Sequence, residues 1–484
     1  MSKGLSKSKL ISYCQCPKKL YLETYQKEAI EVTPEQQKIF DTGHAVGELA
    51  QQFYPDGVLI KHDQELHRAI EETQSLLSNS DVKTLFEATF SHNKVLVRVD
   101  LLHKTKKGLH IQEVKSATSV KDVNITDCAI QKWVLEGSGY KVEQLDLTHI
   151  NNQFIYEVEG QYDGIFSHES LLGQAESLQE NIETWVNDAL AMLASEKEPE
   201  TEPGDHCSNP YTCNFIDYCS PETTKWPVDL LPRGGKTVQE LKDEGIHDIR
   251  DIPEGRLSNA NHERVRRVTV AGKYELDKSV SDVINGFGFP RYYIDFETIQ
   301  FAIPRWIGTK PYNQLSFQWS CHIEDEKGNL EHREFLDISG DDPSEKFIKG
   351  LIDTVGKKGP IFVYNAGFEK TRLNELVVRF PEYKKEVENI LERIIDLWPI
   401  AKKYYYHPDM RGSWSIKSVL PTIAPELNYS ELDEVQDGGG AQSAYLEAID
   451  EGTTEERREA IRKNMIEYCK LDTLAMVKMV KFFS

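Results

Sequence analysis

The chain has 484 residues, which predicts about three domains of ordinary size or two large ones. Hydrophobic residues make up 39% and charged residues 28% of the sequence, a balance typical of globular proteins and unlike that of disordered or collagen-like chains. The formal net charge of −22 argues against a histone-like coat on nucleic acid and against a membrane-surface role, because non-specific affinity for phosphates comes from Lys and Arg. A nucleic-acid enzyme remains open, since its carboxylates can hold metal ions while its basic contacts are confined to a groove.

The sequence carries no sign of export or of membrane insertion. The N-terminus, Met1-Ser-Lys-Gly-Leu, lacks the apolar segment of a secretory signal, and the longest apolar runs are far too short to span a bilayer. We therefore expect a cytoplasmic location and no membrane partner. In such a chain, clustered cysteines favour a metal site over a disulfide framework.

An α/β protein with three regions along the chain is expected. Residues 1–221 combine helical segments with apolar strands and end in a cluster of cysteines. Residues 222–289 contain repeated turn signals and short helical segments, and so predict a mainly helical connector. Residues 290–484 begin with an apolar strand and finish in a long helical segment at the C-terminus.

Two predicted strands of the first region each carry a carboxylate. The apolar runs 95–102 and 109–114 flank a lysine-rich turn and predict a hairpin, with Asp100 on one strand and Glu113 on the other. Because side chains alternate along a strand, Lys115 projects to the same side as Glu113. Carboxylates that bind Mg²⁺ or Mn²⁺, beside a lysine that orients water or offsets charge, suit metal-assisted phosphodiester hydrolysis. Spacing alone favours the alternative, a polar hairpin face.

Further residues surround this hairpin in the sequence. Gln131 follows on a predicted helix at 128–135. One cysteine in a Cys-Pro context precedes the hairpin, and three cysteines separated by five residues each follow it. These four are Cys16, Cys207, Cys213 and Cys219.

This ensemble resembles the iron–sulfur branch of the PD-(D/E)xK superfamily, which includes the AddB nuclease domain and the CRISPR-associated RecB-like exonucleases. The resemblance implies a restriction-endonuclease-like fold in which Asp100, Glu113 and Lys115 form the nuclease core and Gln131 is the helix glutamine. It also implies that the four cysteines hold a 4Fe–4S cluster, which suits four thiolates. Zinc is the alternative for four sulfurs.

The same family uses an upstream His or Glu as a further metal ligand. The segment 43–50 offers both His44 and Glu48, and the sequence does not choose between them. His44 could equally be a surface helix residue. Cys14, which lacks the Cys-Pro context, is expected to be a packed thiol.

A second carboxylate pair opens the last region. Asp295 and Glu297 lie two residues apart in an apolar strand that begins at Tyr292, so they face the same side. Burying two carboxylates without a partner is costly, and a bound cation is a natural explanation. A salt-bridged strand end is the alternative.

Two later segments extend this pattern. A strand at 361–364 leads through Asn365 into a helix with Glu369 in its first turns, and Tyr468 and Asp472 lie four residues apart on one helical face. Together with the Asp-x-Glu strand, these segments resemble the DEDD exonucleases of the tyrosine subtype, with a DnaQ-like, RNase H-like fold.

The resemblance implies two-metal phosphodiester cleavage, in which Asp295, Glu297 and Asp472 hold the ions and the Tyr468 hydroxyl positions the attacking water. Glu369 departs from the family, which usually has Asp at this position, so the geometry there is in doubt. Asp396 matches an Asp that often follows the second motif, and we expect it to be structural.

Two weaker segments concern nucleic-acid contact. Residues 402–417 interleave basic and aromatic side chains, as single-strand binding requires, although an aromatic patch packed on the core is an equal alternative. Residues 238–253 resemble a helix–hairpin–helix unit that binds a DNA backbone, with a plain helical connector as the other interpretation.

In its order of parts, the chain resembles an uncharacterised bacterial family that joins a RecB-like nuclease to a DnaQ-like exonuclease. We therefore expect a metal-dependent nuclease with two centres that hydrolyses DNA, chiefly from single-stranded ends. An RNA-directed exonuclease, or a nucleic-acid-binding scaffold with one or both sites inactive, are the alternatives.

Overall fold

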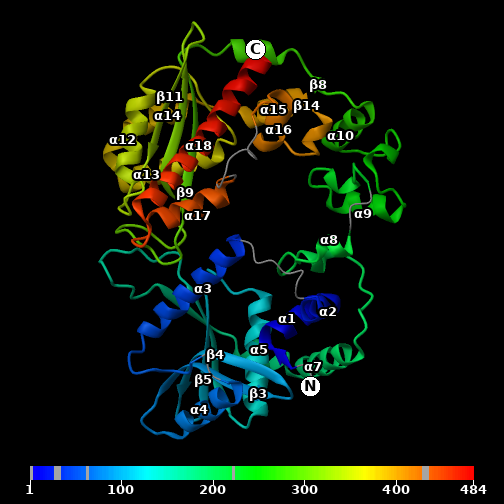
Figure 1. Ribbon diagram of the computed structural model, residues 1–484, viewed down its shortest axis with the longest axis vertical. Coiled ribbons are helices and arrows are strands. Elements are labelled where there is room, and N and C mark those ends of the chain that lie inside the picture. The colour runs from blue at the N-terminus through cyan, green and yellow to red at the C-terminus, as the bar shows by residue number, and fades with distance from the viewer. Residues whose placement is uncertain (1–3, 27–33, 62–64, 221–223, 428–434, 436) are drawn as a thin grey trace. The chain divides into compact units, whose positions relative to one another are not determined.

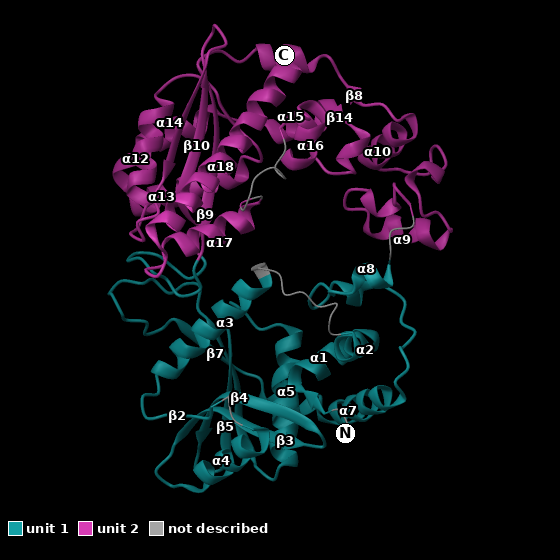
Figure 2. Cartoon of the chain, in the orientation of Figure 1, with its two compact units in different colours: residues 1–221, 301–312 teal, residues 222–300, 313–484 magenta. Residues whose placement is uncertain are grey.

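The protein is a mixed α/β protein, seen in a computed structural model (Figure 1). The described residues are 4–26, 34–61, 65–220, 224–427, 435 and 437–484. The chain divides into two compact units (Figure 2). Unit 1 comprises residues 1–221 and 301–312, and unit 2 comprises residues 222–300 and 313–484.

Unit 1 is built on a sheet whose strands run in the order β2-β3-β4-β5-β6-β7, with β1 paired to β4. The predicted hairpin is present as the antiparallel pair β4–β5, and the connection from β5 to the parallel strand β6 passes through helix α5 (Asp122–Gly137). The strands are β1 (Leu5–Ser6), β2 (Val58–Leu59), β3 (Thr84–His92), β4 (Val95–Lys104), β5 (Leu109–Lys115), β6 (Val142–Ile150) and β7 (Phe166–Ser170).

Helices cover both faces of this sheet. On one face, Leu10, Ile130 and Val186 pack with strand residues in the main apolar core of unit 1. On the other face, Val46 and Leu49 of α3 pack in a smaller cluster. The remaining bounds are α1 (Lys7–Gln15), α2 (Pro17–Tyr25), α3 (Pro34–Gln52), α4 (Leu66–Ser78), α6 (Leu172–Ser177), α7 (Gln179–Ser195), η2 (Asp205–Cys207) and α8 (Ile216–Cys219).

Unit 2 contains a five-stranded mixed sheet in the order β11-β10-β9-β12-β13. Strand β9 pairs antiparallel with β10 and parallel with β12, so it lies at the centre. Its Ile294 and Phe296 pack against one layer of helices, whereas Tyr293 packs on the opposite face. The strands are β9 (Arg291–Ile299), β10 (Leu315–Glu324), β11 (Leu330–Leu336), β12 (Ile361–Val363) and β13 (Ile394–Asp396).

The two faces of this sheet carry different helices. Phe347 of α12, Leu373 of α13 and Val387 of α14 belong to the cluster on the Ile294 face, and Val480 of α18 belongs to the cluster on the Tyr293 face. The bounds are α12 (Ser344–Val355), α13 (Gly367–Arg379), η5 (Pro381–Tyr383), α14 (Lys384–Arg393), α15 (Leu397–Tyr404), η6 (Pro408–Met410), α16 (Ile416–Ile423), α17 (Gly438–Ala448) and α18 (Glu455–Phe483).

The expected connector at 222–289 is mainly helical but is not a separate body. Its Trp226 and Leu241 share one apolar core with Tyr405 and Val480 of the last region. Its strand β8 (Glu275–Leu276) also pairs with β14 (Tyr405–Tyr406). Helices this short gain most of their stability from tertiary packing. Its other elements are η3 (Val228–Leu230), α9 (Gly235–Asp243), η4 (Ile249–Asp251), α10 (Ala260–Ala271) and α11 (Val280–Asn285).

Residues 301–312 lie in the expected last region but belong to unit 1. The Tyr156 amide donates to the Thr309 carbonyl at 3.0 Å, and the Gly308 amide donates to the Tyr156 carbonyl at 2.7 Å. Ala302 joins the smaller apolar cluster of unit 1. Among the helices of the described residues, none has the length and apolar character needed to cross a membrane.

The shared core makes a prediction about residues 222–289. Leu241→Ala removes a fully buried side chain and should lower the free energy of unfolding of unit 2 by about 2–5 kcal/mol. Hydrogen exchange followed by mass spectrometry should show faster exchange in β9 and α18 as well as in α9. Faster exchange confined to α9 would contradict a common core.

Candidate functional site

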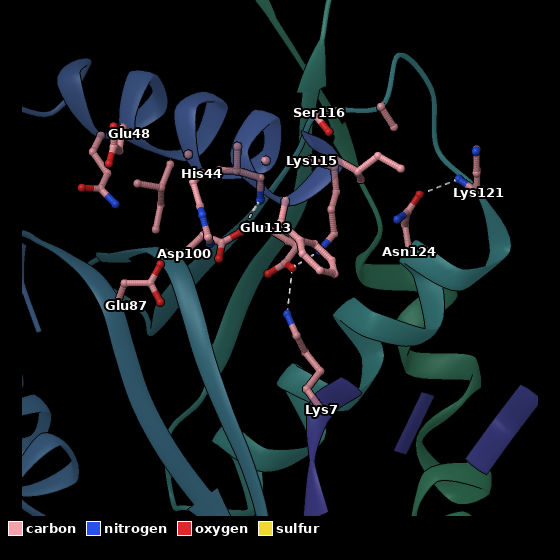
Figure 3. A pocket seen from close by; sticks show the side chains of 18 of the residues that line it. Lys7, His44, Glu48, Glu87, Asp100, Glu113, Lys115, Ser116, Lys121 and Asn124 are labelled. Atoms are coloured by element: carbon pink, nitrogen blue, oxygen red, sulfur yellow. Dashed lines mark hydrogen bonds and ion pairs between the residues drawn. The ribbon is translucent and has the colours of Figure 1, made fainter. Parts of the chain in front are cut away.

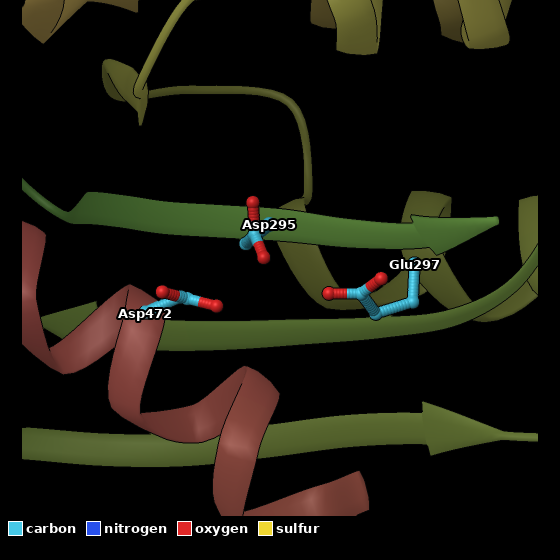
Figure 4. Close-up of side chains that lie close together, drawn as sticks. All are labelled: Asp295, Glu297 and Asp472. Atoms are coloured by element: carbon cyan, nitrogen blue, oxygen red, sulfur yellow. The ribbon is translucent and has the colours of Figure 1, made fainter. Parts of the chain in front are cut away.

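Three carboxylates meet on one face of the unit 2 sheet. Asp295 and Glu297 come from β9 and Asp472 comes from α18, and one oxygen of each lies within 4.8 Å of the others (Figure 4). The two-residue spacing on β9 places the first pair on one face, and α18 packs against that strand. Within the described residues, no other set of three His, Cys, Asp or Glu side chains meets so closely.

Burial and mutual repulsion destabilise the charged forms of this group. Burial raises the pKa of Asp295 well above its ordinary range, and the charges of Asp472 and Glu297 raise it further. Burial, followed by the charge of Asp472, raises the pKa of Glu297 to about 8. A divalent cation relieves such repulsion, and carboxylate oxygens are the ligands that Mg²⁺ and Mn²⁺ prefer. The group therefore fits a metal ion.

Glu369 adds a fourth carboxylate to the same pocket of about 300 Å³. It lies in the first turn of α13, as the sequence predicts, and burial raises its pKa to about 8. Its Oε2 is buried and accepts no hydrogen bond from the described residues. A polar atom left in this state is costly, and a cation in the pocket would compensate it.

The turn before α13 is fixed by Asp396. The Asp396 carboxylate accepts hydrogen bonds from the amides of Asn365 and Ala366, both at 3.0 Å, and from the amide of Trp398 at 2.9 Å. Asn365 has a positive φ of 73°, a conformation that such capping stabilises. Asp396 therefore has the structural role that the sequence predicts.

Tyr468 lines the pocket one helical turn before Asp472. Burial, followed by the charges of Asp472 and Glu297, raises its pKa, so the phenol stays protonated and can donate a hydrogen bond. Lys417 lies with its Nζ 5.4 Å from the centre of the Tyr468 ring and lowers the pKa of Glu297. The sequence analysis did not assign Lys417 to this site. The only signal for it was its position in the basic–aromatic segment 402–417.

The aromatic residues of segment 402–417 belong to the core. Their exposed fractions are at most 8%, and they pack in the main apolar cluster of unit 2. The interpretation as a packed patch is confirmed, and stacking of bases on these rings is excluded. The buried rings are those of Tyr404, Tyr405, Tyr406 and Trp414.

Unit 1 has its own polar pocket, of about 730 Å³, centred on the hairpin (Figure 3). Glu113 is buried there, with its Oε1 2.7 Å from Lys7 Nζ and 2.5 Å from Lys115 Nζ. Its Oε2 accepts a hydrogen bond from Gln131 Nε2 at 2.6 Å. The structure thus brings together Glu113, Lys115 and Gln131 as the sequence predicts.

Lys7 and Asp127 are members of this site that sequence reasoning missed. Asp127 lies 2.8 Å from Lys7 Nζ and 3.0 Å from Lys115 Nζ. Burial alone would raise the pKa of Asp127, but the two ammonium groups hold it well below its ordinary value. Asp127 precedes Gln131 by one helical turn, a spacing that could have revealed it. Lys7 is 106 residues from Glu113, and no local pattern connects them.

Asp100 lies where the β3–β4 ladder is interrupted. The regular pairing skips it and its opposite residue Glu87, whose φ is 57°. The Asp100 carboxylate accepts a hydrogen bond from the Val114 amide at 2.7 Å. Burial, followed by the charge of Glu113, raises the pKa of Asp100 to about 8. Glu87 also lines the pocket and is a further acidic residue that the sequence analysis missed.

His44 and Glu48 both lie on α3 and both line this pocket (Figure 3). Both side chains are exposed. Within the described part of the chain, neither joins Asp100 and Glu113 in a set of three ligands within 4.8 Å. Each remains a candidate for an upstream ligand.

The four predicted cysteine ligands line one small pocket in unit 1. Burial raises the pKa of Cys213 and Cys219, and the neighbouring thiols raise it further. No three of the described sulfurs lie within 4.8 Å of one another, whereas a Zn–S bond of about 2.3 Å would place them about 3.8 Å apart. Cys14 lies outside the pocket and is exposed, so the expectation of a packed thiol was wrong.

The chain is similar to a protein family and to proteins whose names assign no activity. A family model described as "Domain of unknown function (DUF2779)" matches residues 292–415, which include Asp295, Glu297 and Glu369 but neither Tyr468 nor Asp472. The chain is 28% identical over 214 residues to Uncharacterized protein UU173 of Ureaplasma parvum, a match that covers 40% of this chain and 31% of that protein. It is 27% identical over 212 residues to Uncharacterized protein MG366 homolog of Mycoplasma pneumoniae, covering 40% and 32%. The match thus spans about a third of these curated relatives.

The crowded carboxylates make a prediction about stability. Asp295→Asn keeps the shape of the side chain and removes the cost of burying this carboxyl either charged or with an added proton, so near neutral pH it should raise the free energy of unfolding of the metal-free protein by on the order of 1 kcal/mol. Urea unfolding in EDTA measures the change. Glu326→Gln, which removes an exposed charge from the same unit, should change it by less than about 0.5 kcal/mol. A destabilised Asp295→Asn protein would contradict mutual repulsion.

Proposed function

We propose that the chain is a divalent-metal-dependent nuclease that hydrolyses DNA from single-stranded ends and has one centre in each unit. The observation that carries the proposal is the convergence of Asp295, Glu297 and Asp472, with the protonated Tyr468 beside them. Buried acidic groups with mutually raised pKa values are a recurrent property of functional sites. Their geometry suits a cation that contacts a phosphate.

We infer an RNase H-like, DnaQ-type fold for unit 2. The inference is supported by a sheet in which β11, β10 and β9 are antiparallel and β12 and β13 are parallel to β9, with α18 against the strand that carries the acidic pair. For unit 1 we infer a PD-(D/E)xK fold. Two features support this inference: strands β3, β4 and β5 pair antiparallel, and the chain passes from β5 through helix α5 to the parallel strand β6.

In unit 2, bound Mg²⁺ or Mn²⁺ would neutralise the scissile phosphate and lower the pKa of the attacking water. Asp295, Glu297 and Asp472 would hold the ion or ions, with Glu369 as a further ligand. The Tyr468 hydroxyl would donate to the attacking water and orient it. Lys417 would place a positive charge near the phosphate.

In unit 1, Asp100 and Glu113 would be the metal ligands, and Lys115 would orient the water. Both oxygens of Glu113 already contact nitrogen atoms of Lys7, Lys115 and Gln131. A metal ion must therefore compete with at least one ammonium group for Glu113. We expect the unit 1 centre to require a higher metal concentration than the unit 2 centre.

A nuclease assay tests the two centres. With Mg²⁺ or Mn²⁺, the protein should degrade end-labelled single-stranded DNA faster than duplex DNA. Asp295→Ala should remove the activity of the unit 2 centre, and Asp100→Ala should remove that of the unit 1 centre. The rate of DNA degradation by the double variant should be at least about 100-fold lower, which is the loss expected when an essential charge-stabilising group is removed.

The controls separate the alternatives. Glu326→Gln, an exposed substitution in unit 2, should keep full activity. Matched RNA oligonucleotides that are degraded faster than DNA would favour an RNA-directed exonuclease. DNA degradation that survives in the double variant, or DNA binding without cleavage by the unsubstituted protein, would refute the proposal.

We further propose that the four-cysteine pocket of unit 1 holds a 4Fe–4S cluster. The four cysteines that line one pocket support it, because four thiolates are the ligands of such a cluster. A cluster there would tie the N-terminal helices to the segment at 207–219.

The visible absorbance and the metal content of the purified protein test this assignment. Protein purified without oxygen should be brown, with broad visible absorbance and about four irons per chain. Cys207→Ser should lose the absorbance, whereas Cys14→Ser should retain it, because Cys14 lies outside the pocket. A colourless protein with one zinc per chain would contradict the cluster.

A further inference from the structure

A loop from the cysteine-rich segment reaches the acidic pocket of unit 1. Tyr211 lies between Cys207 and Cys213, which line the cysteine pocket, yet Tyr211 itself lines the pocket that contains Asp100 and Glu113. A single loop thus joins two pockets of the same unit. No pattern in the sequence singled out this tyrosine.

Hydrogen bonds to backbone atoms of the loop hold it at its ends and near its tip. The Cys213 amide donates to the Cys207 carbonyl at 2.7 Å and closes the loop. Gln15 Nε2 donates to the carbonyls of His206 and Tyr211, both at 2.7 Å. Because these bonds involve only the backbone of Tyr211, its side chain is not needed to hold the loop.

Large apolar side chains stand exposed around the acidic pocket. The exposed fractions are 54% for Tyr211, 52% for Phe40 and 65% for Ile39, and all three residues line the pocket. Exposed apolar groups that gather at one site mark a binding surface. Unlike the buried rings of segment 402–417, Tyr211 and Phe40 are accessible to a ligand.

Charged groups of the same pocket restrict what this ligand can be. Lys121, at the start of α5, is exposed and lines the pocket. Lys7 and Lys115 also line it but pair with Glu113 and Asp127. Ammonium groups suit phosphates, and exposed rings suit the flat faces of bases. A duplex hides those faces by stacking, whereas a single strand presents them. The combination therefore matches an unpaired strand.

We propose that Tyr211 is a base-stacking residue and that the loop 207–213 is a substrate-binding element of unit 1, selective for a single nucleic-acid strand. This inference rests on the proposed nuclease function and adds the residue that selects the unpaired form. A phosphate contacts Lys121, and one base stacks on the Tyr211 ring.

Binding to two single-stranded oligonucleotides, one with its bases and one without them, tests this role. The full-length protein with Asp100→Ala and Asp295→Ala, which should not cleave, is titrated with a fluorescent single-stranded DNA and with the same strand made abasic throughout. Tyr211→Ala should weaken binding of the normal strand roughly 5- to 100-fold and leave the abasic strand unchanged, since only stacking is lost. Tyr211→Phe should bind both strands as the parent does.

Tyr218→Ala provides a matched control. Tyr218 is 50% exposed in the same segment, but its ring lies outside the acidic pocket, with Lys18 Nζ 5.4 Å from the ring centre. Its loss should leave both affinities unchanged. Equal weakening of both strands by Tyr211→Ala, or no weakening, would overturn the stacking role while the nuclease proposal stands. A parent protein that binds neither strand would refute both.

Discussion

Like charges buried against one another are the constraint on which unit 2 depends. The central strand β9 places Asp295 and Glu297 on the face covered by α18, and α18 places Asp472 against them. Burial and the charge of Asp472 raise the proton affinity of Asp295 and Glu297, so without a cation the site retains protons that exposed carboxylates would release. Packing on both faces of the sheet holds these groups together in spite of their repulsion. The cation binding that we propose would relieve this repulsion, which lowers the stability of the metal-free unit.

Unit 1 meets the same electrostatic problem with its own cations. Glu113 and Asp127 share the ammonium groups of Lys7 and Lys115, so the buried charges are balanced by residues of the chain. Only Asp100, whose pKa is raised to about 8, resembles the carboxylates of unit 2. Compensation by lysine stabilises the folded unit but places a competitor beside any metal ion. If both pockets bind metal as we propose, the two can therefore differ in how strongly they depend on it.

The sequence predicts those parts of each site that lie close together along the chain. The alternation of a strand joins Asp295 to Glu297, and the period of a helix joins Tyr468 to Asp472. The hairpin of unit 1 was predictable for the same reason. The pairing of Lys7 with Glu113 was not, because it depends on tertiary packing across 106 residues. The sequence left the burial of the aromatic run open, since an interleaved basic–aromatic pattern is the same whether its rings face solvent or a core supplied by residues 222–289.

The net charge of −22 constrains the nucleic-acid binding that we propose for these pockets. Long-range attraction is weak or repulsive, so affinity must come from groups that act at short range, such as lysines within a pocket and rings at its mouth. In unit 1, Phe40 and Tyr211 are such rings, because both are exposed and both line the polar pocket. Stacking depends little on salt, whereas phosphate contacts weaken as salt rises. The proposed stacking would therefore let an acidic protein discriminate unpaired strands from duplexes without first accumulating on every nucleic acid it meets.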